Sequence, residues 1–318
     1  MKTLYTNRTL AELYGNKLNE LGWKITSNPQ QANTVSLKTR GMFKKLTEFG
    51  HCSTVWGIPN SFHLVAKQNM WLYIYKYYGL RRAKYITPRT YILKNADDLK
   101  SIEEALANGE TLILKTNKQR RQGIEIIERL DQLTEKRSNE HVVAQQLKIN
   151  TLGFEQRKFH LRYYLAFTVD KGKLRAFIHP KSRVVFACKN SKSKHEKYIT
   201  HNDYYEAHLP LFGFDLVGRK VLNLQTFTRV QKLLRIALKP FEKILTSHLS
   251  NETQYFDLFG ADIIFLENQY PLLIEINRSP SMKPINKKDE ILKKEIVSSF
   301  LNSLNENKFD FKGWQQFF

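Results

Sequence analysis

Glycine-rich phosphate-binding motifs and metal-binding cysteine motifs are both missing from this sequence of 318 residues. It contains no GxxxxGK[ST] loop and no GxGxxG fingerprint, which excludes a Walker-type phosphate loop and a Rossmann-type dinucleotide site. Only two cysteines occur, Cys52 and Cys188, and neither has CxxC or metal-ligand spacing. The nine histidines form no HExxH pattern. We therefore expect no zinc site and interpret both cysteines as free thiols in a reducing compartment.

Acidic residues are few relative to basic ones. The 51 Lys and Arg residues outnumber the 30 Asp and Glu residues, which gives a formal net charge of +21 and a pI of about 9.8. Such a charge attracts polyanions, and a nucleic acid, an anionic membrane or an acidic polypeptide would each fit. A basic surface that serves only solubility is the alternative. Charge alone does not choose among these.

Long hydrophobic runs are missing as well. The uninterrupted apolar stretches, such as Leu112–Leu114 and Leu272–Ile274, are far too short to cross a membrane. The N-terminal segment carries Glu12 and Glu20 and lacks the apolar run of a signal peptide. We expect a cytoplasmic protein without a membrane partner, and a monomer.

Helical and strand patterns are present in a mixture without regular βαβ alternation, which favours an α+β fold over a doubly wound sheet. No repeat, low-complexity linker or Pro/Gly-rich spacer interrupts them, so the lobes should pack closely. We assign an N-terminal α/β lobe to residues 1–66, a central lobe to 67–146 and a C-terminal lobe to 147–318. The patterns predict helices over 67–78, 96–107, 227–241 and 289–304, and strands over 111–115, 124–128, 141–147, 157–169 and 174–178.

The segment 256–280 carries the most informative pattern, two apolar strands around the turn Glu267–Tyr270. If these four residues close the hairpin symmetrically, Asp262 lies opposite Glu275, and Asn277 lies on the same face as Glu275. Opposed carboxylates between apolar strands repel unless a cation lies between them, and oxygen ligands without His or Cys suit Mg²⁺. The three residues are therefore predicted to hold Mg²⁺. A solvent-facing hairpin with a polar side is the alternative.

Cationic side chains accompany this carboxylate pair. Lys158, His160 and Arg162 alternate with apolar residues and so share one face of a strand. A row of cations beside a carboxylate–metal site suits a triphosphate, and Arg183 could extend that row. Lys115 ends a strand and could hold phosphates as a point charge. For each of these residues singly, a basic surface position is the alternative.

Taken in this order, the features resemble the tubulin tyrosine ligase-like family, ATP-grasp enzymes that add amino acids to peptides. The matching segments are Ile58–Lys67, Thr87–Leu93, Leu114–Lys115, Val142–Gln146, Arg157–Arg162 and Phe256–Pro280, of which the last is the most specific. The resemblance implies an ATP-grasp-like fold in which two lobes enclose a nucleotide cleft beside the small N-terminal lobe.

The resemblance also implies a role for each matching residue. ATP phosphates would contact Lys67, Lys115 and Lys158, adenine would contact the Gln145/Gln146 region at the hinge between lobes, and His160 and Asn277 would complete the nucleotide site. Magnesium would be coordinated by Asp262, Glu275 and Asn277. The acyl-phosphate or the incoming amino acid would be bound by Arg162 and Arg183. Thr200 and Asn202 fall near a Leu-Thr-Asn motif of the family.

Three departures from the family pattern concern substrate choice more than ATP binding. His160 stands where the family usually has Asp, and Gln68 stands where Asp is common. The loop Thr116–Gly123 has one glycine where relatives are richer in glycine, and its three basic residues are Lys118, Arg120 and Arg121.

The implied activity is that of an ATP- and Mg²⁺-dependent ligase. ATP would activate a carboxylate of an acidic peptide, such as a tubulin tail, and the amine of a free amino acid would then attack the acyl-phosphate. Glutamate is the leading amino acid, with tyrosine and glycine open, and the cytoskeleton is an expected location. The alternative is a catalytically degenerate member that binds microtubules or RNA.

Overall fold

The structure is a computed structural model that describes residues 2–6, 8–36, 52–116, 123–134, 140–189, 191–305 and 311–318. The loop cations Lys118, Arg120 and Arg121 lie outside these ranges. Helices and strands are mixed around two sheets, so the predicted α+β class is confirmed. No helix in the described ranges is both long and apolar enough to span a bilayer.

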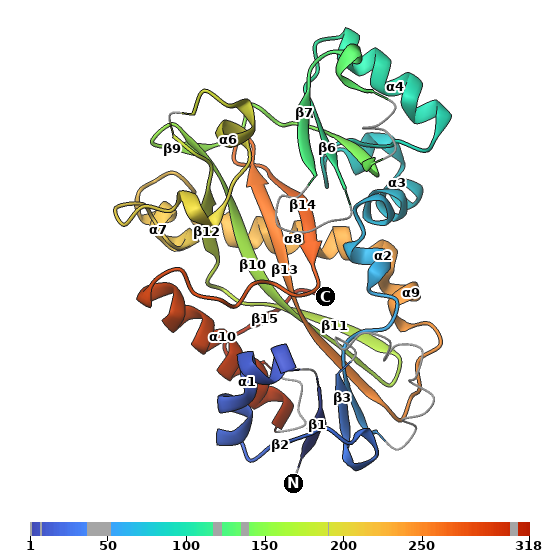
Figure 1. Ribbon diagram of the computed structural model, residues 1–318, viewed down its shortest axis with the longest axis vertical. Coiled ribbons are helices and arrows are strands. Elements are labelled where there is room, and N and C mark those ends of the chain that lie inside the picture. The colour runs from blue at the N-terminus through green and yellow to red at the C-terminus, as the bar shows by residue number, and fades with distance from the viewer. Residues whose placement is uncertain are drawn as a thin grey trace.

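A large sheet forms the body of the molecule, with the path β15-β11-β10-β13-β4-β3-β1-β2 and with β9, β12 and β14 attached beside it. Its strands are β1 (Thr3–Tyr5), β2 (Lys24–Thr26), β3 (Thr34–Ser36), β4 (Thr54–Trp56), β9 (Gly153–Phe154), β10 (Arg157–Asp170), β11 (Lys173–Ile178), β12 (Arg183–Phe186), β13 (Gln254–Phe265), β14 (Pro271–Asn277) and β15 (Gln315–Gln316). The first four strands are parallel where they pair, and β10 to β14 are antiparallel. The long strands β10 and β13 run side by side through the centre (Figure 1).

A second sheet of four antiparallel strands stands at the upper end in Figure 1. Its order is β5 (Thr90–Ile92), β8 (Val143–Gln146), β6 (Leu112–Lys115) and β7 (Ile124–Ile127). The helix α4 (Ala96–Ala107) packs Ile102 against Leu112 and Leu114 on one face. Because side chains alternate along a strand, Ile113 and Lys115 point to the opposite face of this sheet, away from α4.

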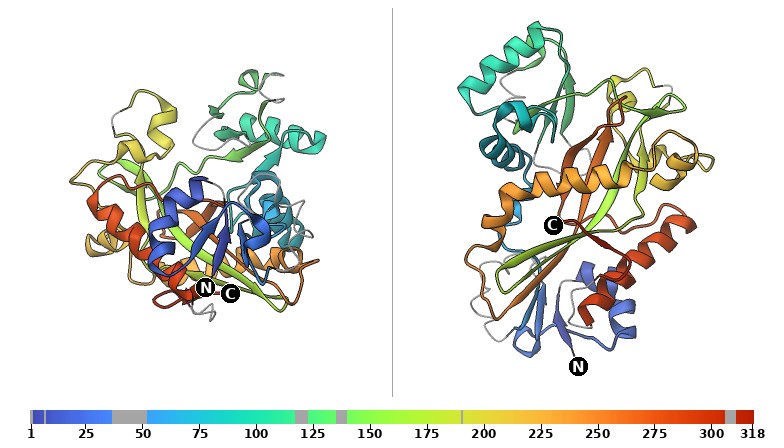
Figure 2. Two further views of the ribbon diagram at one scale, coloured as in Figure 1. Left: turned by 60° about the horizontal axis from the view of Figure 1, so that its bottom comes forward. Right: turned by 180° about the vertical axis from the view of Figure 1, so that it is seen from behind.

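Both faces of the large sheet are covered, and each cover follows from an apolar pattern. On one face lies α8 (Thr226–Leu238), which packs on β14 and whose Val230, Leu234 and Leu238 recur at helical spacing and share one buried core with side chains of β10 and β13. Beside it are α2 (Phe62–Val65), α3 (Lys67–Ala83), η5 (Lys239–Phe241) and α9 (Glu242–Thr246). On the other face lie α1 (Arg8–Glu20) and α10 (Lys287–Asn305). Figure 2 shows α8 and α10 on opposite sides. The remaining short helices are α6 (Lys194–Tyr198) and α7 (Gly213–Gly218).

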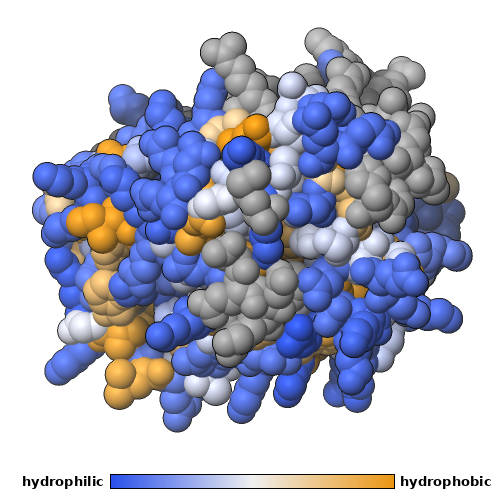
Figure 3. Space-filling model, turned by 90° about the horizontal axis from the view of Figure 1, so that it is seen from below, coloured by the Kyte–Doolittle hydropathy of each residue, from blue (hydrophilic) through white to orange (hydrophobic). Residues whose placement is uncertain are grey.

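The structure has two sheets for the three predicted lobes, and the lobe boundaries stay predictions. The second sheet falls entirely within residues 67–146, whereas strands of 1–66 and of 147–318 share the large sheet through the β4–β13 pairing. Helix α4 has the predicted bounds, because Asn95 caps its first turn by accepting from the backbone N–H groups of Asp97 and Asp98. The surface seen from below is largely hydrophilic, with small apolar patches (Figure 3).

Gly79 interrupts α3 with a backbone conformation that other residues rarely adopt. Its φ and ψ angles of 71° and 164° break the helical geometry, so the predicted helix over 67–78 is followed by one separate turn that ends at Ala83. Only glycine adopts this region without strain. The chain therefore changes direction at Gly79 before Arg81 and Arg82.

Replacing Gly79 by Ala should lower the free energy of unfolding by about 1–2 kcal/mol, because the positive φ strains any residue with a Cβ atom. Gly218→Ala is the matched control, since Gly218 ends α7 without a positive φ and an added Cβ would meet no atom within 4 Å. The control should be neutral or stabilising by up to about 1 kcal/mol. Urea unfolding of both variants measures the difference. Equal stability of the two variants would contradict the assigned backbone.

Candidate functional site

Four charged side chains form one row across four neighbouring strands of the large sheet. The register pairs Arg183 on β12 with Arg162 on β10, Arg162 with Asp262 on β13, and Asp262 with Glu275 on β14. Directly paired residues point to the same face of a sheet. Two cations therefore stand beside two anions on the face opposite α8.

The predicted opposition of Asp262 and Glu275 is confirmed, but the symmetric four-residue turn is wrong. Phe265 pairs with Pro271, and the Leu266 N–H donates to the Tyr270 carbonyl, so three residues form the loop. This register alone would place an apolar residue, Ile274, opposite Asp262. A β-bulge between the pairs of Asp262 and Ile263 inserts one residue into β14 and restores Glu275 to that position.

The Asp262 carboxylate accepts a two-pronged hydrogen bond from the Arg162 guanidinium. Arg162 Nη2 lies 2.7 Å from Asp262 Oδ2, and Arg162 Nε donates to Oδ1. His160 Nε2 is 3.4 Å from the same Oδ1. Asp262 is only 5% exposed. Burial by itself would raise the pKa of the Asp262 carboxyl, but Arg162 and His160 hold it well below its usual range.

The predicted metal ligands meet at one point beside this ion pair. Asn277 Nδ2 lies 3.0 Å from Glu275 Oε1 and 3.4 Å from Asp262 Oδ2, so the three side chains converge. Within the described ranges, no group of three or more His, Cys, Asp and Glu side chains could hold a metal ion. Two carboxylates and one amide nevertheless fit Mg²⁺, which commonly takes only one or two protein carboxylates and completes its shell with water and phosphate oxygens. An ion here would compete with Arg162 for an oxygen of Asp262.

Lys115 approaches the same carboxylates from the second sheet. Its ammonium Nζ donates to Gln145 Oε1 at 2.6 Å, and Gln145 Nε2 donates to Thr90 Oγ1 at 2.9 Å. Lys115 is 6% exposed. Burial lowers the pKa of Lys115 to about 8, Glu275 raises it in part, and the nearby charge of Lys67 lowers it further. These charge interactions place Lys67 and Lys115 next to the metal-ligand candidates.

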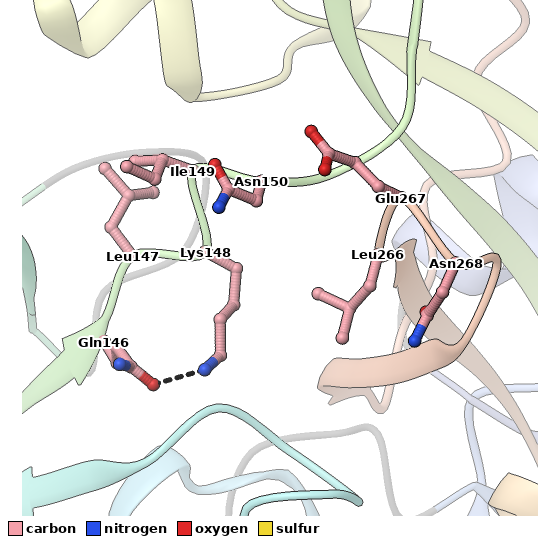
Figure 4. A pocket seen from close by; sticks show the side chains of 8 residues that line it. All are labelled: Gln146, Leu147, Lys148, Ile149, Asn150, Leu266, Glu267 and Asn268. Carbon is pink, nitrogen blue, oxygen red and sulfur yellow. Dashed lines mark hydrogen bonds between the residues drawn. The ribbon is translucent and has the colours of Figure 1, made fainter.

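A hollow of about 450 Å³ lies where the second sheet joins the large one (Figure 4). It is lined by residues 146–150, which leave β8, and by residues 266–268 of the β13–β14 turn. Gln146 and Gln145 point to opposite faces of β8, so they cannot share one function by direct contact. Gln146 accepts from Lys148 Nζ at 2.5 Å and donates to Glu110 at 2.9 Å.

Lys158 is directed at this hollow rather than at Asp262. Its Nζ donates to the Thr151 carbonyl at 3.0 Å and to the Ile149 carbonyl. Burial lowers the pKa of Lys158, and Glu267 at the rim of the hollow partly offsets this. The predicted row of three cations is therefore divided: His160 and Arg162 contact Asp262, and Lys158 lies at the hinge between the sheets.

Arg183 belongs to a buried charge cluster that sequence reasoning missed. Arg183 Nε lies 3.8 Å from Asp289 Oδ1, and Asp289 Oδ2 lies 2.7 Å from Lys293 Nζ. All three are almost fully buried, and burial lowers the pKa of Arg183. Asp289 and Lys293 are four residues apart on α10, a spacing that also occurs in exposed helix pairs, so the sequence offered only an ambiguous signal.

Two further residues shape the site. Thr200 Oγ1 lies 2.6 Å from His160 Nδ1, so the segment near the Leu-Thr-Asn match holds the histidine that replaces the family's Asp. A Cβ atom on Gly260 would lie 3.0 Å from Arg162 Cδ and 3.0 Å from Pro280 Cβ. Gly260 thus leaves room for the Arg162 side chain, and a glycine inside an apolar strand was the signal available for it.

The fold and the site define a mixed α+β protein in which two carboxylates and one amide converge on the large sheet, close to Arg162 and to Lys115 of the second sheet. Residues 46–310 match the profile of the tubulin-tyrosine ligase family. The chain belongs to the tubulin-tyrosine ligase family, as the motifs of the sequence indicate.

Curated relatives carry the same family character at low identity. The chain is 25% identical over 270 residues to "Tubulin polyglutamylase ttll-4" of Caenorhabditis elegans and 26% identical over 272 residues to the protein of the same name from Caenorhabditis briggsae. These matches cover 77% of this chain but 44% and 45% of the relatives. A "Probable alpha-tubulin polyglutamylase Ttll1" of Tetrahymena thermophila is 30% identical over 89 residues, 28% of this chain and 19% of that protein. The chain thus spans less than half the length of these curated relatives.

Replacing Arg162 by Leu, without added Mg²⁺ or nucleotide, should destabilise the fold by about 3–5 kcal/mol, because Asp262 is left charged and buried beside Glu275. The double variant Arg162→Leu/Asp262→Leu should recover most of this loss, since neither partner then remains unpaired. Urea unfolding measures both values. If Arg162→Leu is as stable as the native chain, the ion pair between Arg162 and Asp262 does not stabilise the site.

Proposed function

We propose that this protein is an ATP- and Mg²⁺-dependent ligase that adds an amino acid, glutamate in the first place, to a carboxylate of an acidic peptide or protein such as a tubulin tail. The observation that carries this proposal is the convergence of Asp262, Glu275 and Asn277 with Arg162 on one sheet and Lys115 on the other. Family membership supports the class of reaction. The names of the relatives favour glutamate over tyrosine or glycine and tubulin as the substrate.

In the proposed reaction, Lys67 and Lys115 bind the triphosphate from the second sheet and the start of α3, and Lys158 binds it near the hinge. Their positive charge neutralises charge that spreads over phosphate oxygens during transfer. When bound by Asp262, Glu275 and Asn277, Mg²⁺ would supply the same neutralisation between the phosphates. The hollow at residues 146–150 and 266–268 is the proposed place for adenine.

The proposed chemistry proceeds in two steps. An oxygen of the substrate carboxylate bonds to the γ-phosphorus of ATP, ADP leaves, and an acyl-phosphate results. The amine nitrogen of the free amino acid then bonds to the acyl carbon, phosphate leaves, and the amine loses a proton as the amide forms. In this proposal Arg162 and Arg183, which pair directly on β10 and β12, bind the anionic groups of the acyl-phosphate or the amino acid.

A second candidate function is a catalytically degenerate member that binds a polyanion such as microtubules or RNA. Two observations favour it: His160 replaces an Asp of the family pattern, and the net charge is +21. Retention of Asp262, Glu275 and Asn277 favours the ligase. The two functions differ in nucleotide binding. If the protein is the ligase, ATP should raise its melting temperature only when Mg²⁺ is present. If it is a degenerate polyanion-binding protein, ATP with Mg²⁺ should leave the melting temperature unchanged.

Incubation of the protein with ATP, Mg²⁺, labelled amino acids and a panel of acidic peptides should give a mass increase of one or more glutamate residues. Glu275→Gln should lower the rate by about 100-fold or more, because it removes charge from the proposed metal site. Glu252→Gln, at an exposed position, is the matched control and should leave the rate unchanged. The ligase is disproved if no peptide gains mass, or if both variants match the native rate.

The affinity for ATP should fall with rising pH through the charge of Lys115. Because burial lowers the pKa of Lys115 to about 8, its ammonium is charged below that pH and neutral above it in the free protein. Binding of a triphosphate must then restore the proton, so the Kd rises, approaching about tenfold per pH unit above pH 8. Titrations between pH 7 and 9.5 at fixed Mg²⁺ measure this. The Lys115→Arg variant stays charged over this range, so its Kd for ATP should not change with pH. If the Kd values of the native chain and of the variant change with pH in parallel, Lys115 does not bind the triphosphate as proposed.

A further inference from the structure

A basic surface with exposed aromatic rings covers the outer sides of α3 and α8. We name it the α3–α8 surface and define it by Tyr75, Lys76, Tyr77, Leu80, Arg81 and Arg82 of α3 and by Lys232, Arg235 and Ile236 of α8. All nine side chains are exposed. None of them belongs to the site described above or lines a described hollow.

The two helices are joined directly, so the surface is continuous. Tyr78 donates a hydrogen bond from its hydroxyl to the Ile236 carbonyl at 2.9 Å, and the rings of Tyr73 and Phe241 stack 5.1 Å apart. Seen from behind, α8 crosses the molecule and its C-terminal end lies beside α3 (Figure 2, right). The surface is therefore built on packed helices rather than on loops.

Its charge is of one sign. Residues 49–96 contain seven Lys and Arg but no Asp or Glu, and residues 216–241 contain six Lys and Arg and again no acid. None of Lys76, Arg81, Arg82, Lys232 and Arg235 forms an ion pair within the described ranges. The adjacent Lys239 does pair with Glu242, at 2.6 Å. These five cations therefore form a basic surface that can attract an anionic partner, in a chain whose formal net charge is +21.

Apolar and aromatic side chains stand among these cations. Tyr77 is 56% exposed and Ile236 is 44% exposed, and the Tyr75 ring stacks on Trp71 at 5.8 Å, which orients it. Tyr and Arg are the residues most enriched among those that dominate protein–protein binding energy. Held on helices, they would lose little conformational freedom on binding.

We propose that the α3–α8 surface binds the acidic protein that carries the modified carboxylate, at a place separate from the reaction site. This inference rests on the proposed ligase function. The separation follows from the sheet, because α8 packs on the face that bears Leu161 and Ile263, whereas Arg162 and Asp262 point to the other.

The geometry links this surface to the reaction site through one helix. Lys67 begins α3 beside Lys115, and ten residues at 1.5 Å each place Tyr77 about 15 Å further along. An extended chain covers about 15 Å in roughly five residues. A substrate held by its folded acidic part could therefore extend an acidic tail of more than about five residues to the carboxylate site, whereas a free peptide of about three residues would not span the two places.

The position of the surface outside the described hollows, rather than its charge, favours a protein over a nucleic acid as the occupant. Proteins that bind single strands use a charged groove that follows the backbone, and the α3–α8 residues line neither described hollow. The surface instead presents rings and cations on the exposed sides of two helices.

The test compares Arg81→Glu/Arg235→Glu with Lys24→Glu/Lys100→Glu, a control that changes the net charge equally at exposed positions elsewhere. With intact tubulin as substrate, the first variant should raise KM at least about tenfold at low salt, while kcat/KM stays unchanged for an acidic peptide of about three residues, which is too short to span the two places. The control should alter neither. Tyr77→Ser/Ile236→Ser should weaken tubulin binding without any charge change. Equal effects on tubulin and the short peptide, or no effect on either, would overturn the proposal.

Binding measured without catalysis separates the two proposals. Fluorescence anisotropy of labelled tubulin should show the same loss for Arg81→Glu/Arg235→Glu, whether or not the protein turns over. If turnover fails but this selective loss persists, the ligase function is wrong and the surface assignment holds. If single-stranded RNA binds more tightly than tubulin and loses affinity in the same variant, the surface is a nucleic-acid site and the proposal fails.

Discussion

The fork between the Asp262 carboxylate and the Arg162 guanidinium is the interaction on which the rest of the site depends. Asp262 is almost fully buried and faces a second carboxylate, Glu275, on the next strand. Such a pair is stable only with positive charge close by. Arg162 supplies it from β10, and Gly260 leaves the space that its side chain occupies. The bulge in β14 then determines that a carboxylate, and not Ile274, faces Asp262.

The need for compensating charge also applies to the buried residues next to Arg162. Arg162 stands beside Arg183, so a second compensating charge is needed, and Asp289 of α10 provides it together with Lys293. The buried charges of α10 and of the four strands thus form one connected cluster in which each cation has an anion as a neighbour. A buried arrangement of this kind holds its charged groups in fixed positions before a substrate arrives, which is the condition under which electrostatic stabilisation is most effective. Lys115 adds charge from the second sheet, so both sheets must be in place to complete the site.

Helix α3 joins recognition and chemistry in the functions proposed above. Its first residue, Lys67, lies near Lys115, and its last turns carry the cations of the α3–α8 surface. Gly79 redirects the chain between these two parts. A substrate bound at one end of the helix would therefore be held at a fixed distance from the groups at the other end. Length and stiffness of the helix, rather than contacts in the site itself, would then select substrates with an acidic tail of sufficient reach.

Much of the local structure could be predicted, because the signals are local. Asn95 caps α4, and alternation along β10 places His160 and Arg162 on one face. The helix predicted over 227–241 ends earlier, at Leu238, just before Pro240. The opposition of Asp262 and Glu275 was also predicted, although from a turn that the chain does not form. The bulge could not be predicted, since an inserted residue has no periodic signature.

The sequence by itself therefore determined which charged residues exist, which face of its strand each occupies, and the family to which the chain belongs, because each of these is encoded over short stretches. Only the tertiary structure decided which charges meet. Arg162 and Asp262 are 100 positions apart, and Asp289 reaches Arg183 from a different element altogether. Such contacts depend on strand order, register and helix docking, which are settled by the packing of the whole chain and not by any segment of it. The metal-ligand candidates were recognisable in the sequence because they lie within one short segment. Their dependence on Arg162 became apparent only in the folded sheet, because Arg162 lies on a distant strand.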